Sequence, residues 1–225
     1  LLAALEPNDA AIESLRSLRT GLSFAMMGAK NKNIVITGAT SNLGKSFVSA
    51  NLSAVIAAAG KRVLLIETDL RRPQLGAYFG FTGEDGLSDY LAGAVPLESI
   101  IRKDIATIPR LDVISSGRIP PNPGELLLSD RFSQLLEDLQ PSYDYIIVDS
   151  APVLPVGDTL AVARCASTIF LVARAERSTV REVTDAIRKL QSAGSEVKGL
   201  IFNGVMRQRL SYGYAYRYYY GYESK

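Results

Sequence analysis

Short, continuously apolar segments alternate with helical patterns along most of this chain. A strand that is apolar on both faces belongs in a parallel sheet with helices covering both sides. We therefore expect an α/β fold with a mostly parallel central sheet, in which ligands bind at the carboxyl ends of the strands. The predicted strands are Asn33–Thr37, Arg62–Ile66, a weaker one over Ile105–Ile108, Leu111–Ser115, Tyr145–Val148, Thr168–Ala173 and Val197–Phe202.

Helical patterns fill the intervals between these strands. An opening helix follows Pro7, where Asn8 or Asp9 can cap the first turn, and extends to about Met27. At 225 residues, a single domain can bury a substantial core. The other predicted helices are Lys45–Ala59, Leu87–Ala92, Ser129–Leu139, Asp158–Arg164 and Thr179–Ser192.

The residue composition argues against several classes of protein. The net charge of +2 is too small to indicate nucleic-acid binding. Histidine is absent, which removes the commonest general base and the commonest zinc ligand. The single cysteine, Cys165, cannot form a disulfide within the chain, and its apolar surroundings favour a buried structural thiol over a nucleophile. A lone cysteine indicates a reducing compartment, by default the cytoplasm.

No segment has the roughly 18 uninterrupted apolar residues that a membrane-spanning helix needs. The most apolar segment, Phe47–Ala58, is interrupted by Ser49, Asn51 and Ser53. No basic region followed by an apolar one marks a signal peptide. Because the chain starts at Leu1 rather than at methionine, we expect a fragment of a longer protein, with any membrane segments outside it.

A glycine-containing segment lies between the first predicted strand and the helix after it. It covers residues 38–46 and ends in Gly-Lys-Ser. Backbone N–H groups of such a loop can surround phosphates, Lys45 can reach the terminal phosphates, and the Ser46 hydroxyl can ligate Mg²⁺. The usual template opens with glycine, but that position is Ala39 here, with Gly38 one residue earlier. We predict that ATP or ADP binds with Mg²⁺ at Ser41, Asn42, Leu43, Gly44, Lys45, Ser46 and Phe47.

Acidic residues follow two of the predicted strands. Glu67 and Asp69 come after the strand over residues 62–66, and Asp149 follows the strand over residues 145–148. Carboxylates at such places can hold a metal directly or through its water, as phosphoryl transfer requires. Taken singly, each acidic residue could be a helix cap or a turn residue, and the Gly-Lys-Ser segment could be a chance turn. Their combination indicates a nucleotide site.

Four features together resemble the bacterial tyrosine kinases that regulate capsular and exopolysaccharide export. Val63–Arg71 is similar to that family's second acidic motif, Asp-x-Asp-x-Arg, and Asp144–Pro152 is similar to its metal-binding strand. Glu13, Arg16 and Arg19 match the helix motif through which those kinases pack into rings. The fourth feature is a tyrosine-rich C-terminus.

This C-terminal segment, residues 211–225, has one alanine as its only aliphatic residue. With so little to bury, it is expected to form a mobile tail. The resemblance implies an autophosphorylation cluster that supplies acceptors to its own site or to a neighbour's. Alternating tyrosines could instead mark an edge strand, or the segment could be a sticky low-complexity region. The predicted phosphoacceptors are Tyr212, Tyr214, Tyr216, Tyr218, Tyr219, Tyr220 and Tyr222.

Phosphorylation of tyrosine requires particular catalytic groups. A tyrosine hydroxyl has a pKa of about 10. As a nucleophile it therefore needs a carboxylate to take its proton and a metal to offset charge on the phosphate. By resemblance, Glu67 is the candidate base and Asp69 is a metal-linked carboxylate. Lys45 and Arg71 complete the predicted catalytic set.

The resemblance also assigns the remaining ligands of the nucleotide. It implies that Ser46, Asp69 and Asp149 hold Mg²⁺. It further implies that Asn203, at the end of the last strand, contacts the adenine base. A turn at Asn203-Gly204 explains this asparagine almost as well.

The sequence departs from the pattern of the family in three further respects. Glu67 stands where the family usually has aspartate, and the extra methylene predicts a reduced or differently tuned activity. Ser41-Asn42 replaces a common Pro-Gly pair, which predicts a less rigid loop. Some relatives have a regulatory tyrosine shortly after the arginines of the second acidic motif. Gln74 follows them here, so we expect that gate to be absent.

The resemblance implies partners, a location and a division of the chain. Glu13, Arg16 and Arg19 share one helix face, which implies a homo-oligomeric ring such as an octamer, although ordinary solvated pairs have the same spacing. Further implied partners are a transmembrane polysaccharide co-polymerase segment or activator, and a protein-tyrosine phosphatase. Residues 1–210 would be the catalytic domain, with the oligomerisation motif within 1–29, at the cytoplasmic face of the bacterial inner membrane.

Two other functions are compatible with this fold. A partition or septum-positioning ATPase shares both acidic motifs, but it carries a second lysine early in the loop, where this chain has Thr40. The other alternative is a non-catalytic module that binds nucleotide and changes its assembly state. Phosphorylation of the tail by ATP alone distinguishes the kinase from both.

Overall fold

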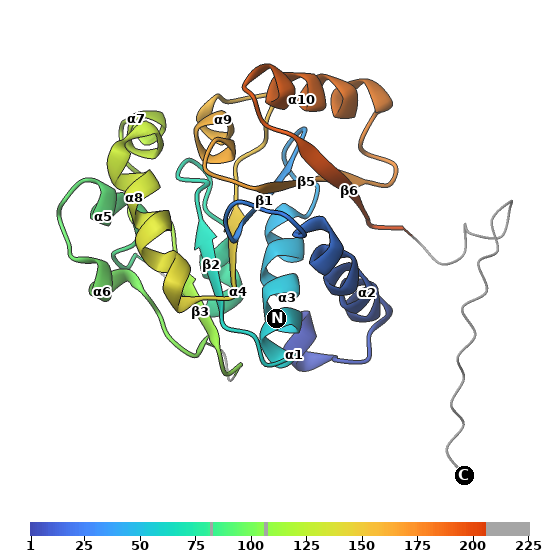
Figure 1. The fold of residues 1–225 in the computed structure, drawn as a ribbon, viewed down its shortest axis with the longest axis horizontal. Helices are drawn as coiled ribbons and strands as arrows, with labels where there is room; N and C mark the ends of the chain where they lie inside the picture. Colours follow the sequence, from blue (N-terminus) through green and yellow to red (C-terminus); the bar gives the residue numbers. More distant parts are fainter. Residues whose placement is uncertain (82, 106–107, 206–225) are drawn as a thin grey trace, which may run out of the picture.

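A six-stranded sheet forms the centre of the protein (Figure 1). The computed structural model describes residues 1–81, 83–105 and 108–205. The strands are β1 (Asn33–Gly38), β2 (Val63–Glu67), β3 (Leu111–Ile114), β4 (Tyr145–Asp149), β5 (Thr168–Arg174) and β6 (Val197–Asn203). Their order is β3-β2-β4-β1-β5-β6, and every neighbouring pair is parallel. The predicted parallel α/β architecture is confirmed.

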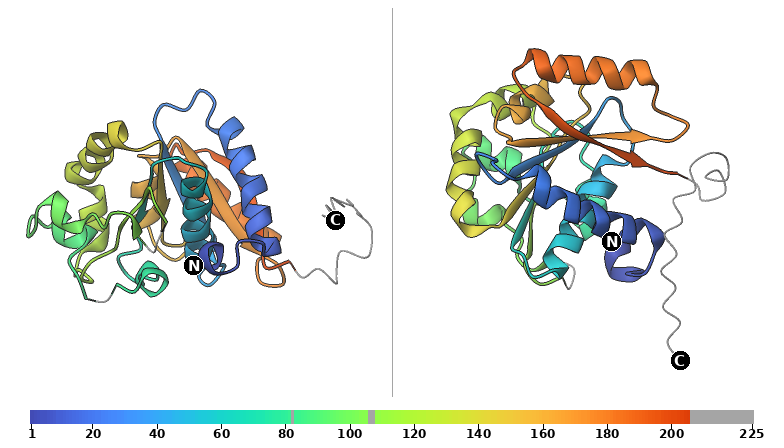
Figure 2. Two further views of the ribbon diagram at one scale, coloured as in Figure 1. Left: turned by 90° about the horizontal axis from the view of Figure 1, so that it is seen from below. Right: turned by 45° about the vertical axis from the view of Figure 1, so that its right-hand side comes forward.

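Helices cover both faces of this sheet, as Figure 2 shows from two further directions. One face is covered by α1 (Leu2–Leu5), α2 (Ala10–Ala25), α3 (Lys45–Ala58) and α4 (Leu75–Phe79). The opposite face is covered by α5 (Leu87–Leu91), α6 (Leu97–Ile100), α7 (Pro123–Leu128), α8 (Asp130–Leu139), α9 (Asp158–Ala163) and α10 (Val180–Ser192). Because helices lie on both sides, β1 and β2 are buried along their whole length, which explains their continuously apolar sequences.

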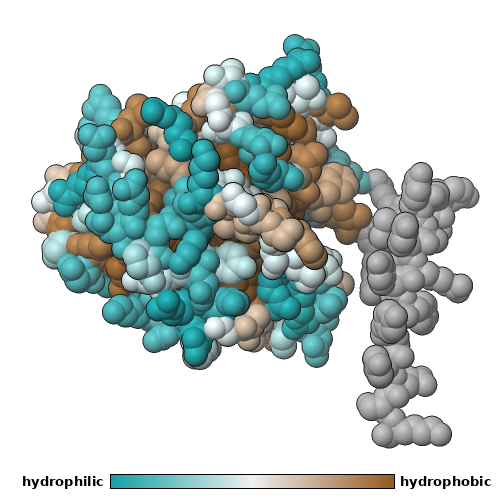
Figure 3. Space-filling model, in the orientation of Figure 1, coloured by the Kyte–Doolittle hydropathy of each residue, from teal (hydrophilic) through white to brown (hydrophobic). Residues whose placement is uncertain are grey.

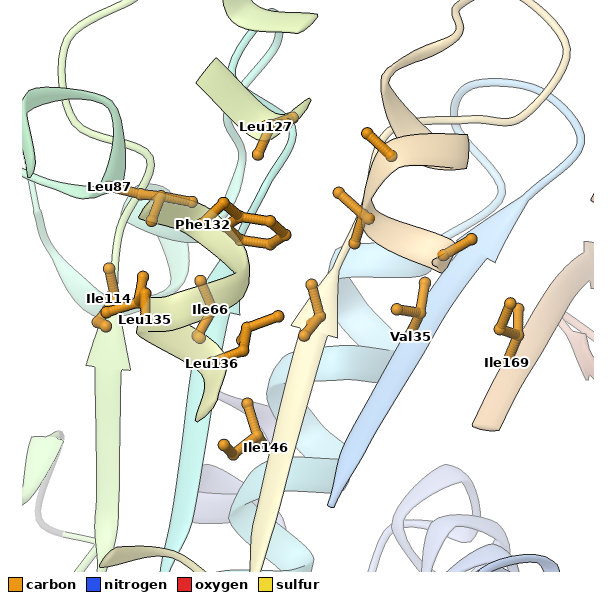
Figure 4. Packing of buried hydrophobic residues seen from close by; sticks show 14 of the residues in the cluster. Val35, Ile66, Leu87, Ile114, Leu127, Phe132, Leu135, Leu136, Ile146 and Ile169 are labelled. Atoms are coloured by element: carbon orange, nitrogen blue, oxygen red, sulfur yellow. The ribbon is translucent and has the colours of Figure 1, made fainter. Parts of the chain in front are cut away.

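A core of large side chains lies between the sheet and α8 (Figure 4). Phe132 and Leu136 of α8 pack over Ile66 of β2 and Ile146 of β4, and all four side chains are buried. Burying a side chain of this size stabilises a fold by about 1.5–3 kcal/mol. This packing fixes the position of α8 on the strands that carry the acidic residues.

The boundaries of most elements agree with the sequence to within about two residues. Asp9 caps α2 as predicted, because its Oδ1 accepts a hydrogen bond from the Ala11 amide at 2.7 Å. That helix ends at Ala25, two residues before the predicted end. The short helices α4 and α6 were not predicted, since five and four residues are too few to show a helical period.

The weak strand predicted over residues 105–108 can be compared with the structure only at its two end residues. Residues 106–107 lie outside the described residues, and neither Ile105 nor Ile108 belongs to a strand. Instead, Arg102 forms a single antiparallel bridge with Val113 of β3. Pro109 follows directly and has no N–H to donate to a sheet, which is a physical reason for the difference.

On the face shown in Figure 3, polar residues predominate, and apolar side chains are exposed beside the end of β6. Leu200 and Phe202 of this edge strand are 55% and 65% exposed. In the part of the chain that the structure describes, no helix has the length and apolar character needed to cross a bilayer.

The core between α8 and the sheet predicts a large effect of shortening its aromatic side chain. We expect Phe132→Ala to lower the free energy of unfolding by about 3–5 kcal/mol, since the variant loses buried area and gains a cavity. Urea denaturation followed by circular dichroism measures this. Gln134→Ala, on the exposed side of the same helix, is the control and should change stability by less than about 0.5 kcal/mol. Equal effects of the two variants would contradict the packing.

Candidate functional site

The carboxyl ends of β1, β2 and β4 meet at one edge of the sheet. Ile36 of β1 and Glu67 of β2 are both in register with Asp149 of β4. The residues that follow these strands are therefore neighbours in space, although they are far apart in the sequence. This edge brings together the loop over residues 38–46, Asp69 and Asp149.

The loop over residues 38–46 has a backbone that requires glycine next to α3. Gly44 is the N-cap of α3 and has a φ of 88°, in the left-handed region. A Cβ atom at Gly44 would lie 2.2 Å from Nδ2 of Asn203. That Asn203 amide donates to the Leu43 carbonyl at 2.9 Å, so it ties the loop to the end of β6. Such a contact orients the loop amides without covering them.

Asp149 is a fully buried carboxylate directly below this loop. Its Oδ1 accepts a hydrogen bond from the Ser49 hydroxyl at 2.9 Å. Burial raises the pKa of Asp149 to about 7, while a hydrogen bond from Ser46 and the charge of Lys45 oppose this rise. A cation bound nearby would favour the ionised carboxylate, so this side chain is suited to ligate a metal directly or through water.

Lys45 begins α3 and is itself mostly buried. Burial lowers the pKa of Lys45, and the negative charges of Asp149 and Asp69 act in the opposite direction. Its ammonium group is therefore within electrostatic reach of two carboxylates at a helix N-terminus, where backbone N–H groups favour an anion. This arrangement is complementary to a polyphosphate bound with a cation.

A cavity of about 550 Å³ opens at this edge of the sheet. Eight of the residues predicted for the site line it, from the loop and from the end of β2: Ser41, Asn42, Gly44, Lys45, Ser46, Phe47, Asp69 and Arg71. Four other predicted residues are not among the lining residues: Leu43, Glu67, Asp149 and Asn203. Leu43 is buried in the core, Asp149 lies beneath the loop, and Asn203 contacts the loop.

Glu67 was predicted to be the catalytic base, but its side chain does not line the cavity around Lys45. Its side chain is buried and accepts hydrogen bonds from the backbone amides of Gln74, Leu75 and Ser116. Burial raises the pKa of Glu67, and these amides partly offset the rise. It lines a second, smaller cavity of about 190 Å³ rather than the one around Lys45.

Arg71 lines the larger cavity with its guanidinium bound to another element. Its Nε atom donates to Oδ2 of Asp158, and its Nη2 atom donates to Oδ1 of the same carboxylate at 3.2 Å. Asp158 begins α9 and is almost completely buried. The pair therefore fastens the segment after β2 to α9, and it orients Arg71 at the rim of the cavity.

Several lining residues were not predicted from the sequence. Arg174, the last residue of β5, donates to the Asn42 carbonyl at 3.2 Å, and its position at a strand end was a usable signal. Arg72, Gln74 and Tyr78 line the cavity from the segment after β2 and from α4. Tyr78 lines the same cavity as Gln74, four residues later in the chain.

A lysine that does not line the cavity holds the loop around residues 152–156, which forms part of the cavity wall. The Lys189 ammonium on α10 donates to the carbonyls of Val153, Leu154 and Val156, at 2.7, 3.3 and 3.4 Å. The loop that these carbonyls belong to lines the cavity through Pro152 and Val156. The wall is therefore held by a charge that does not itself face the cavity.

The residues present suit Mg²⁺ that arrives with a nucleotide. Among the described residues, no group of three or more acidic, cysteine or histidine side chains could hold a metal by itself. Mg²⁺ commonly uses one or two protein carboxylates together with phosphate oxygens and water. Ser46, Asp69 and Asp149 provide such an incomplete set beside a loop with the geometry of a phosphate cradle.

The predicted oligomerisation residues lie on α2, on the side of the molecule away from α8. Arg16 pairs with Glu13 at 2.8 Å and also donates to the Pro7 carbonyl. Arg19 donates to the Val55 carbonyl of α3 at 3.4 Å. All three thus have contacts within the chain. The predicted phosphoacceptor tyrosines lie outside the described residues.

Comparisons with known proteins agree with this geometry. The family model described as an AAA domain matches residues 31–198. Tyrosine-protein kinase etk of Escherichia coli (strain K12) is 46% identical over 215 residues, which cover 96% of this chain and 29% of that protein. The solved kinase domain of Escherichia coli tyrosine kinase ETK has a TM-score of 0.89 at 46% identity, over 96% of this chain and 84% of that one. The chain belongs to the bacterial tyrosine-protein kinase family.

Within this bacterial tyrosine-protein kinase family, the chain corresponds to the kinase domain. It spans about 30% of the length of the curated relatives that it matches. The cell-division protein MinD of Aquifex aeolicus shares the fold at a TM-score of 0.64 and 27% identity, over 80% of this chain and 72% of that one. The greater similarity to ETK, together with Thr40 in the loop, favours the kinase family over the septum-positioning ATPases.

The buried carboxylate predicts a specific dependence of stability on pH. The folded pKa of Asp149, about 7, lies above its ordinary value, so the folded protein holds this proton where the unfolded chain has lost it. Stability from this group is therefore present below about pH 4 and lost as the pH rises to about 7. Asp149→Asn removes the effect, and we expect nucleotide-free Asp149→Asn to melt above the wild type by about 4 °C or more at pH 8.

Thermal melts at several pH values measure this difference. It should shrink toward pH 4, where both proteins are uncharged at this position. Asp138→Asn, on the exposed side of α8, is the control and should show little change with pH. A constant difference in melting temperature across the range would contradict a buried titrating carboxylate.

Proposed function

We propose that this chain is the catalytic domain of an ATP-dependent protein-tyrosine autokinase. It would phosphorylate the C-terminal tyrosines of its own or a neighbouring copy, and so regulate polymerisation and export of exopolysaccharide or capsule. The observation that carries the proposal is the cavity at the carboxyl edge of the sheet, which is lined by Lys45, Ser46 and Asp69. Similarity to the ETK kinase domain supports the reaction class.

The loop and α3 bind the triphosphate in this proposal. Backbone amides around Gly44 surround the β- and γ-phosphates, and Lys45 offsets their charge. Ser46, Asp69 and Asp149 would hold Mg²⁺, which neutralises charge on the phosphates when it is bound. Arg174 and Asn203 keep the loop in place through its carbonyl groups.

Phosphoryl transfer then follows from the position of the acceptor. The tyrosine oxygen attacks the γ-phosphorus, a new O–P bond forms, and the bond to ADP breaks with its electron pair left on ADP. The phenol proton passes to a carboxylate at the end of β2. The resemblance assigns that proton to Glu67, whereas Asp69 is the member of the pair that lines the cavity.

Loss of the loop lysine should abolish self-phosphorylation. With Mg²⁺ and ATP, the wild-type protein is expected to gain one or more phosphates on the tail, as measured by intact mass spectrometry and peptide mapping. Lys45→Met should lower the rate by about 10²–10³-fold, because a preorganised charge on the transferred group is removed. Lys61→Met, at an exposed lysine beyond the end of α3, is the control.

The same measurement separates the kinase from the other functions. A wild-type protein that binds or hydrolyses ATP but gains no phosphate would overturn the kinase proposal in favour of an ATPase or a nucleotide-dependent assembly switch. A protein without affinity for ATP or ADP in calorimetry would overturn the nucleotide site itself.

We further propose that copies of the domain assemble into a ring through the face of α2 that carries Glu13, Arg16 and Arg19. Exposure of the Glu13–Arg16 pair beside the buried Ile12 and Leu15 supports this proposal. Activation by a transmembrane co-polymerase segment, removal of phosphate by a protein-tyrosine phosphatase, and a place at the cytoplasmic face of the inner membrane belong to the same proposal.

Charge changes on this face should weaken self-association. Arg16→Ala is expected to raise the dissociation constant of the assembly by about tenfold, and tail phosphorylation should act in the same direction, because each phosphate adds about −1.5 to −2 charge. Light scattering over a range of concentrations measures both effects. Arg181→Ala on α10 is the control. A wild-type protein that stays monomeric at high concentration would exclude the ring.

A further inference from the structure

The carboxylate of Glu67 is bonded by three backbone amides and by the side chain of Ser116. Its Oε1 accepts hydrogen bonds from the amides of Gln74 and Leu75, the latter at 2.7 Å. Its Oε2 accepts from the Ser116 amide at 3.2 Å. The side chain is 1% exposed. Both oxygens therefore accept from buried N–H groups, those of Leu75 and Ser116, which would be costly to leave without a partner.

These amides belong to two segments that are far apart in the sequence. Gln74 and Leu75 form the start of α4, and Ser116 lies in the turn after β3. That turn is itself packed tightly, because a Cβ atom at Gly117 would lie 2.4 Å from an Asp89 carboxylate oxygen. One carboxylate at the end of β2 thus holds α4 against a rigid turn.

The segment held in this way forms one wall of the nucleotide cavity. Arg72, Gln74 and Tyr78 line that cavity, and all three lie within or just before α4. Asp69 orients the same segment from the other end, since its Oδ1 accepts from the amides of Arg71 and Arg72. This wall is therefore held by two side-chain carboxylates in addition to the burial of Leu75 in the core.

We infer that Glu67 is a positioning residue, whose carboxylate holds the α4 wall of the nucleotide cavity through three backbone amides, and is not the group that takes the proton of the acceptor tyrosine. A general base must come within about 2.6–3.2 Å of the proton that it removes. Glu67 lines only the smaller cavity, and its oxygens are already occupied, whereas Asp69 lines the larger one. The statement that Glu67 is not the proton acceptor rests on the proposed function. The statement that Glu67 positions α4 does not depend on it.

The two roles predict different behaviour of Glu67→Gln, which has nearly the same shape but keeps one acceptor oxygen instead of two. If Glu67 positions the wall, the amides of Gln74, Leu75 and Ser116 should exchange with solvent about tenfold faster, because bonds to a charged acceptor are lost. The dissociation constant for Mg²⁺-ADP should rise by about fivefold or more, while kcat at saturating ATP falls by less than about tenfold. If Glu67 is the base, exchange and affinity stay unchanged and kcat falls by about 10²–10⁴-fold.

Hydrogen exchange of the nucleotide-free domain and calorimetry with Mg²⁺-ADP measure the first two quantities, and phosphate incorporation measures kcat. Glu84→Gln is the matched control, since Glu84 lines the same small cavity but pairs with Arg102. Faster exchange at the three amides with weaker ADP binding supports the inference. Unchanged exchange, or a loss of kcat with unchanged ADP affinity, overturns it.

Glu67→Asp provides a second variant if Glu67→Gln does not fold. It keeps the negative charge but shortens the side chain by one methylene, so it should still expose the Ser116 amide to faster exchange and weaken ADP binding. Unchanged exchange and affinity in Glu67→Asp would overturn the positioning role. If the wild-type protein shows no kinase activity, the proposed function fails on that measurement alone. Hydrogen exchange and the affinity for ADP then still test whether Glu67 holds the wall.

Discussion

The parallel register of β1, β2 and β4 is the constraint on which the whole site depends. It places the ends of these strands side by side, so that the loop over residues 38–46 lies above Asp149 and next to Asp69. Because successive residues of a strand point to opposite faces, a slip by one residue would turn Asp149 away from the loop. Burial of both faces of β1 and β2 makes such a slip costly. The hydrophobic core therefore fixes the relative positions of the charged groups.

Two charged side chains of opposite sign hold segments that line the cavity, and neither side chain lines the cavity itself. Glu67 accepts from three backbone amides on one side, and Lys189 donates to three backbone carbonyls on the other. Irregular segments cannot satisfy their own polar groups as helices and strands do. A single charged side chain that bonds several of these groups gives each wall a defined shape. The cavity is thus bounded by loops and a short helix that are nevertheless well positioned.

The same fold serves proteins with different activities, so fold similarity alone does not distinguish a kinase from a MinD-like ATPase. In this chain, further side chains surround the phosphate loop and its cavity. Arg71 is oriented by Asp158 of α9, Arg174 supports the loop from β5, and Tyr78 reaches the cavity from α4. The Arg174 contact reaches the loop directly, and the Arg71–Asp158 pair joins the segment after β2 to α9.

The sequence by itself determined the parallel α/β architecture, the loop ending in Lys45-Ser46 and the acidic residues at the strand ends. Apolar periodicity and short motifs reflect the backbone conformation and the burial of a segment, and these depend on residues that are close together in the sequence. The tertiary structure decided which carboxylate faces the cavity: Asp69 lines it, whereas Glu67, two residues earlier, bonds the amides of α4 and Ser116. It also brought Tyr78 and Arg174 to the cavity, and Lys189 to the loop behind its wall. Their roles arise from packing between elements far apart in the chain, and no local pattern carries that information.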